Sequence, residues 1–212
     1  GLLHMNEIFS KVSARVSAIG YRADMETALR TPDMAGYQLL SIQDFPGQGT
    51  AHVGILDNFM EDKPGGFTKE QYKSFNDSVV VLAQLPKLVL TNSEDLTGTI
   101  SVVNYGPAAL DGVVGQWKLT NGDTVLAEGT LDATDVAQGG VTEIGAFTTS
   151  LAGVTEAAKL KLEVSVDSIG SNSYDLWVYP SDLNPTVPSD VLVSTNMDQA
   201  TLQALENGQK VL

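Results

Sequence analysis

The feature that most constrains the fold is a series of short apolar segments, separated by turn residues, between residues 78 and 180. From Ala158 to Val166 apolar side chains alternate strictly with polar ones, which is the pattern of a strand with one buried face. Asn121-Gly122-Asp123 is the clearest hairpin turn. This spacing predicts a β-sandwich of about seven or eight strands, so the expected fold class is mainly β. The candidate strands are residues 79–83, 87–91, 98–104, 113–119, 124–130, 141–149, 160–166 and 174–179.

The residues before the sandwich begin with a helical region. Residues 1–5 have the sequence of a cloning remnant, because a His-Met pair stands directly before the first native-looking residue. From residue 6 to residue 30 apolar side chains recur at helical spacing, and we expect two helical stretches divided at Gly20. Pro32 should end the second stretch, because the residue before a proline seldom joins a helix.

A strand and a short helix are expected between this region and the sandwich. Residues 36–43, GYQLLSIQ, are a nearly continuous strand candidate that leads into a polar, glycine-rich loop at 44–50. The helix at 68–75 is expected to begin at a capping box, because Thr68 and Gln71 have the required spacing.

The last region predicts the start of a further α/β unit. It contains a strand at 191–193, a helix at 197–205, Gly208 as the helix C-cap and a second strand at 211–212. Neither terminal element completes its own packing, so we expect the chain to be a part of a longer protein. The predicted domains are 1–5, a remnant; 6–77, a helix and strand region; 78–182, the sandwich; and 183–212, a linker and α/β start.

Composition excludes several classes of partner. The chain has 26 acidic and 12 basic residues, a formal net charge of −14, and would therefore repel a nucleic-acid backbone. No apolar run approaches the roughly 20 residues that cross a bilayer, so no membrane partner is expected. The absence of cysteine excludes disulfides and zinc–thiolate sites. We expect no cofactor.

Residues 29–57 carry a resemblance to a known family. Their sequence, LRTPDMAGYQLLSIQDFPGQGTAHVGILD, resembles the end of the (β/α)8 barrel in bacterial proteins of glycoside hydrolase family 2, the β-galactosidase and β-glucuronidase group. The resemblance implies that the strand ending at Asp44 and Phe45 is the eighth of the barrel, and that an immunoglobulin-like sandwich follows. Residues 6–77 would then be the C-terminal part of a barrel. Residues 196–212 are similar to the start of an α/β domain in some multidomain members.

The resemblance implies that the catalytic residues lie outside this chain. Members of the family hydrolyse with retention through two glutamates, at the ends of barrel strands four and seven, and both lie upstream of this sequence. No residue here is therefore expected to be catalytic. Glu7, Glu26, Glu61 and Glu70 are expected to be solvated surface groups. The compartment is unknown, with a periplasmic or secreted parent protein as one option.

Four residues are candidates for contact with a substrate. Loops after barrel strands form the active-site rim, which makes Gln43, Asp44, Gln48 and His52 the rim candidates. The alternative for Asp44 is a structural role, capping backbone N–H groups of the glycine-rich loop. His52 has no partner at metal-site or triad spacing, so no metal site is predicted. Relatives have a tryptophan in the sugar site where this sequence has Leu40, so no particular sugar is predicted.

The two tryptophans have different predicted roles. Trp117 shares strand parity with Leu119 and is expected in the sandwich core. Trp177 and Tyr179 lie on the face of their strand opposite to its apolar side chains. That face is expected to contact a neighbouring domain of the parent glycosidase, with stacking against a carbohydrate as the alternative.

Together these patterns predict a non-catalytic portion of a multidomain glycoside hydrolase that acts in carbohydrate degradation. The sandwich would order the neighbouring domains, and this chain by itself would be inactive. The alternative is a carbohydrate-binding sandwich that uses exposed aromatic side chains. A stand-alone adhesin-like domain fits less well, because α/β elements flank the sandwich.

Overall fold

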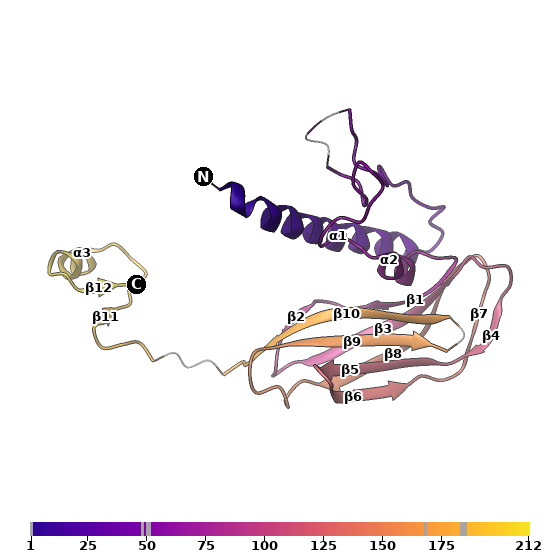
Figure 1. Ribbon diagram of the computed structural model, residues 1–212. Coiled ribbons are helices and arrows are strands. Elements are labelled where there is room, and N and C mark those ends of the chain that lie inside the picture. Colours follow the sequence, from indigo (N-terminus) through magenta and orange to yellow (C-terminus); the bar gives the residue numbers. More distant parts are fainter. Residues whose placement is uncertain (1, 48, 50–51, 168, 183–185) are drawn as a thin grey trace. The chain divides into compact units, whose positions relative to one another are not determined.

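The computed structural model describes residues 2–47, 49, 52–167, 169–182 and 186–212. The chain forms two compact units, Gly1–Tyr179 and Pro180–Leu212, and each is described by itself (Figure 1). Within the described residues no helix is both long enough and apolar enough to cross a bilayer. The helices are α1 Asn6–Arg30 and α2 Lys69–Phe75 in the first unit, and α3 Gln199–Glu206 in the second.

The β-sandwich of the first unit confirms the predicted mainly β fold class. Its strands are β1 Val79–Gln84, β2 Val89–Thr91, β3 Asp95–Asn104, β4 Leu110–Val113, β5 Gly115–Asn121, β6 Thr124–Thr130, β7 Thr134–Val136, β8 Gly140–Ser150, β9 Ala158–Val166 and β10 Gly170–Tyr179. One sheet has the order β1-β3-β8 and the other the order β2-β10-β9-β5-β6 (Figure 1). Neighbouring strands are antiparallel, except that β2 runs parallel to β10.

The strands agree well with the alternation of the sequence. Each predicted run overlaps a strand, with ends that differ by a few residues. The predicted hairpin is confirmed, because Asn121 pairs with Thr124 and Gly122 has the positive φ of 56° that such a turn requires. The short pair formed by β4 and β7 was missed, because its ladder is interrupted by an irregularity and no alternation develops.

The core of the sandwich lies between the two sheets. The four apolar side chains predicted to face inward on β9 are at most 1% exposed. They belong to the same buried cluster as Ile100 and Val102 of β3. Trp117 packs against this cluster as predicted, and its ring stacks on Phe147 with the centroids 4.9 Å apart. Removal of this apolar surface from water is the main stabilising contribution to the sandwich.

Helix α1 is continuous from Asn6 to Arg30, so the predicted division at Gly20 is wrong. A glycine inside a helix costs only about 1 kcal/mol relative to alanine, and packing of the second half of α1 offsets that cost. Ala18 and Met25 are buried in a second apolar cluster. The predicted end before Pro32 is confirmed, because Thr31 is extended. Between residues 6 and 17 no side chain of this helix is buried.

Residues 36–43 do not form the predicted strand. Gln43 alone makes a bridge, parallel to Leu56, and Leu56 also bridges Asp62. A strand needs a neighbouring strand to satisfy its N–H and C=O groups. Among the described residues none forms a ladder with 36–42, so this segment stays irregular.

Helix α2 begins at the predicted capping box. The Thr68 hydroxyl accepts a hydrogen bond from the Gln71 N–H, and the Gln71 side chain accepts one from the Thr68 N–H. The helix ends at Phe75, which is fully buried and packs against Phe67 and Tyr72. This aromatic group joins α2 to the cluster that also contains Met25 of α1.

The second unit, Pro180–Leu212, confirms the predicted strand, helix and strand order. Strands β11 Val191–Leu192 and β12 Lys210–Val211 pair in parallel, with α3 between them in the chain. Asp198 caps α3 through its side chain. Gly208 follows the helix with a φ of 77°, which is the conformation of a glycine C-cap.

Candidate functional site

The Asp44 carboxylate is hydrogen-bonded within the segment that follows it in the first unit. Its side chain is buried, and Oδ1 accepts hydrogen bonds from Lys63 Nζ at 2.6 Å and from the Gly54 N–H at 2.9 Å. Lys63 Nζ also donates to the Gly54 carbonyl at 2.7 Å, and His52 Nδ1 lies 3.5 Å from Asp44 Oδ2. Burial acts to raise the pKa of Asp44, but the hydrogen bonds from Lys63 and Gly54 outweigh it, and the pKa is lowered. Asp44 therefore joins the two ends of the loop 44–63.

Of the three rim candidates that the structure describes, two lie together and one makes a separate contact. Asp44 and His52 line the same hollow of about 680 Å³, between α1 and the loop 44–67. The side-chain amide of Gln43 instead donates a hydrogen bond from Nε2 to the Asn58 carbonyl oxygen, at 2.6 Å. Gln48 lies outside the described residues. The structure thus brings together Asp44 and His52, and Lys63 joins them although its sequence position did not suggest it.

Among the described residues that line the hollow, both carboxylates are already engaged in hydrogen bonds. Its lining carboxylates are Asp44 and Asp57. Asp57 accepts hydrogen bonds from the Phe59 and Glu61 N–H groups, and Asp44 is bound as described above. A retaining glycosidase needs two carboxyl groups free to attack and to protonate. Among the described residues no group of three or more His, Cys, Asp and Glu side chains could hold a metal ion.

Trp177 and Tyr179 lie on the outer face of β10. Tyr179 is 45% exposed, whereas Trp177 is partly buried and is not in the hollow. Lys159 Nζ lies 5.8 Å from the centroid of the Trp177 ring and 2.7 Å from Asp175 Oδ2. Val89 of β2 pairs with Trp177 on the other side and is exposed. Trp177 therefore lies between Val89 and Lys159, its partners on the two adjacent strands.

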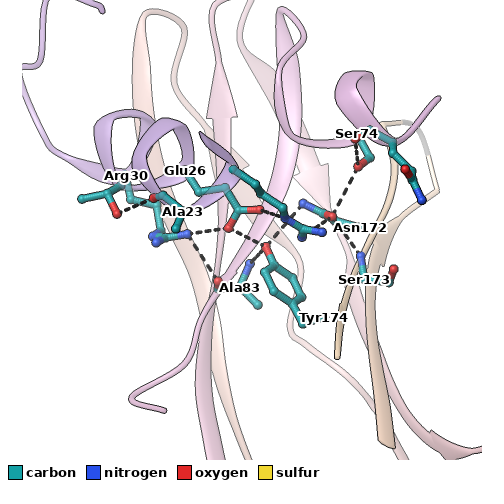
Figure 2. A network of polar contacts seen from close by, with 11 residues as sticks. Ala23, Glu26, Arg30, Ser74, Ala83, Asn172, Ser173 and Tyr174 are labelled. Carbon is teal, nitrogen blue, oxygen red and sulfur yellow. Dashed lines mark hydrogen bonds and ion pairs between the residues drawn. The ribbon is translucent and has the colours of Figure 1, made fainter. Parts of the chain in front are cut away.

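A buried polar network joins α1 to the sandwich (Figure 2). At its centre is Glu26, which is 4% exposed, so its predicted position on the solvated surface is wrong. Glu26 Oε1 accepts a hydrogen bond from Arg22 Nε at 2.7 Å, and Oε2 accepts one from Arg30 NH1 at 2.9 Å. The Tyr174 hydroxyl of β10 also donates to Oε2, at 3.1 Å. The spacing of the sequence indicates these two ion pairs, because Arg22 and Arg30 each stand four residues from Glu26 on the same helix.

The sandwich side of the network consists of β1 and β10. The Tyr174 hydroxyl accepts hydrogen bonds from the Ala83 N–H at 2.9 Å and from Asn172 Nδ2 at 3.3 Å. Asn172 Oδ1 accepts one from Arg22 NH2 at 2.8 Å. Burial, followed by the nearby Glu26 carboxylate, raises the pKa of Tyr174 well above its usual value. We call Arg22, Glu26, Arg30, Ala83, Asn172 and Tyr174 the junction network.

Comparisons with known proteins give one family match, within the sandwich, and several similar structures. Residues 94–180 match a family described as "Domain of unknown function (DUF8488)". None of the curated protein sequences is significantly similar to the chain. The exo-chitosanase CsxA of Amycolatopsis orientalis has a similar structure, with a TM-score of 0.55 at 16% identity over 80% of this chain and 19% of the enzyme. A CsxA variant in complex with PNP-beta-D-glucosamine matches with a TM-score of 0.54 at 16% identity, over 79% of this chain and 19% of that one.

The similarity to the exo-chitosanase extends beyond the sandwich. Residues 78–180 are only about half of the chain, so an overlap of 80% must also include residues outside them. At this low identity the likeness shows the fold alone, a β-sandwich with accompanying segments. The chain spans 19% of the length of that enzyme.

Proposed function

We propose that this chain is a non-catalytic portion of a multidomain glycoside hydrolase related to family 2. In this proposal the sandwich holds the region 6–77 in place beside the rest of the enzyme. The observation that supports it most directly is the division of α1 between two surroundings. The second half of the helix is joined to the sandwich, whereas the first half has no buried side chain.

The first half of α1 has the pattern of a contact surface. Ile8, Val12, Val16 and Ile19 recur at helical spacing, and each is more than half exposed. A monomeric soluble protein rarely leaves a continuous apolar stripe uncovered, so such a stripe marks a site of contact with another surface. A neighbouring domain of the parent enzyme would cover it.

The structural comparison supports a proposal for the substrate class. An enzyme with this sandwich fold is an exo-chitosanase. We therefore propose β-glycosides of hexoses or hexosamines as substrates of the parent enzyme, with the catalytic glutamates outside this chain.

The carbohydrate-binding alternative has less support. Stacking against a sugar requires an open aromatic face. Lys159 lies over the Trp177 ring, and Tyr179 is the exposed aromatic side chain of this strand face. Contact between this face and another protein domain suits the mixture of Val89, Trp177 and the Lys159–Asp175 ion pair better.

A hydrolysis screen tests the proposal. This chain and the natural protein extended upstream are assayed side by side with aryl β-glycosides, including PNP-β-D-glucosamine. We expect turnover by the extended protein and none by this chain. Turnover by this chain alone would show that catalytic residues lie within it, and inactivity of the extended protein on every substrate would reject the glycosidase assignment.

A further inference from the structure

We propose that Glu26 is the positioning residue that fixes α1 on the sandwich, because it completes the hydrogen bonds at the edge of strand β1 that faces no other strand of its sheet. In the absence of its carboxylate, α1 would separate from a sandwich that stays folded. This inference concerns the junction network and does not depend on the proposed glycosidase function.

Strand β1 has an edge that needs covering. It is the first strand of the order β1-β3-β8, so its second edge faces no strand of that sheet. At Ala83 the backbone groups of that edge are satisfied by side chains. The Ala83 N–H donates to the Tyr174 hydroxyl at 2.9 Å, and the Ala83 carbonyl accepts from Arg30 NH1 at 3.4 Å. Unpaired backbone groups at an edge strand are costly when buried and promote association when exposed.

Tyr174 connects the two sheets, and Glu26 connects Tyr174 to the helix. Tyr174 belongs to β10, in the opposite sheet from β1. Its hydroxyl has one hydrogen to donate, which goes to Glu26 Oε2, while the oxygen accepts from Ala83 and Asn172. Figure 2 shows Glu26, Tyr174 and Ala83 pointing toward one another, from the helix and from the two sheets. The helix is thus hydrogen-bonded to one strand of each sheet, β1 and β10.

Glu26 also holds two arginines in position. Arg30 reaches the Ala83 carbonyl and Arg22 reaches Asn172 Oδ1 while both bind the same carboxylate. Arg22 in addition lies over the Tyr174 ring, 4.5 Å from its centroid. Two guanidinium groups at these positions would repel each other without the carboxylate between them, so its removal weakens both contacts to the sandwich.

Apolar packing supplies only part of the contact between α1 and the sandwich. Ala18 and Met25 are buried in the second apolar cluster, and Tyr21 and Leu29 pack against it while partly buried. This cluster is smaller than the core of the sandwich. In the first half of α1, the exposed Arg15 lies 3.9 Å from Asp175 of β10, so the buried polar contacts between the helix and the sandwich are those of the junction network.

Hydrogen exchange measured by mass spectrometry on the whole chain tests this inference. The variants are Glu26→Ala, Glu26→Gln and the matched control Asp24→Ala, which changes an exposed carboxylate on the same helix. We expect Glu26→Ala to speed exchange of amides in residues 18–30 by roughly tenfold or more, with little change in β9. Glu26→Gln keeps the shape and some acceptor capacity and should fall between wild type and Glu26→Ala. Asp24→Ala should match wild type.

Two outcomes would overturn the inference. Unchanged protection of residues 18–30 in Glu26→Ala would show that apolar packing suffices. Equal loss of protection in β9 would show that Glu26 supports the sandwich itself and does not position the helix. If Glu26→Ala does not fold, Glu26→Gln decides by the same comparison. The hydrolysis screen can reject the glycosidase assignment while the exchange experiment supports the role of Glu26, and the opposite combination can also occur. The failure of one proposal is therefore distinguishable from the failure of the other.

Discussion

Replacement of Tyr174 by phenylalanine tests the energetics of the junction network most directly. Tyr174→Phe keeps the ring that lies beneath Arg22 but removes the hydroxyl that binds Glu26, Ala83 and Asn172. The Ala83 N–H then loses its acceptor at an edge that faces no other strand of its sheet. Leaving a buried donor unsatisfied costs about 1–3 kcal/mol. Glu26 retains Arg22 and Arg30 as donors, so we expect a net loss near the middle of that range.

The assay is thermal and urea unfolding followed by circular dichroism. A loss of about 2 kcal/mol corresponds to a fall in Tm of roughly 4–8 °C for a unit of this size. Tyr105→Phe is the control, because that side chain is exposed, and it should change stability by less than about 0.5 kcal/mol. Equal stability of Tyr174→Phe and wild type would refute the reasoning, because water would then replace the hydroxyl without cost.

Two further predictions concern the core and the loop. Gly129→Ala should lower the free energy of unfolding by about 1–3 kcal/mol, because the added Cβ would lie 2.6 Å from Nε1 of Trp117. The same change should shift the tryptophan fluorescence. Unchanged fluorescence and stability would contradict this contact. The pKa of Asp44 is lowered in the folded state, so its stabilisation of the loop is complete above the unfolded-state pKa and is lost as the pH falls through the folded one. The Gly54 amide, followed by NMR, should therefore lose protection from hydrogen exchange when the wild-type protein is acidified. Asp44→Asn should show no such loss at acid pH. The same acid-dependent loss in both proteins would exclude Asp44 as its cause.

The local patterns of the sequence determined most of the secondary structure. Alternation on β9, the Asn121-Gly122 turn and the capping box at Thr68 each act within a few residues, so they could be interpreted without knowledge of the fold. The helical spacing of α1 also predicted a helix. Its continuity through Gly20 was not predictable, because the helix packs against the sandwich and against α2, which are distant in sequence.

Tertiary structure alone decided which polar residues are buried. Glu26 and Tyr174 are 148 residues apart, and Asp44 meets Lys63 across 19 residues. Glu26, Asp44 and Lys63, each taken by itself, have the sequence surroundings of an exposed group. Their burial depends on partners supplied by other strands and loops, because a charge leaves water only when opposite charges and hydrogen bonds are already in place.

The sequence by itself therefore determined a mainly β chain with a sandwich at residues 78–180. Only the tertiary structure decided that residues 36–43 remain without a ladder, that Asp44 binds Lys63, and that Glu26 of α1 accepts a hydrogen bond from Tyr174 of β10. The physical reason is the range of the interactions. Side-chain alternation and turn geometry act over a few residues, whereas strand pairing and buried ion networks need groups that only the folded chain brings together.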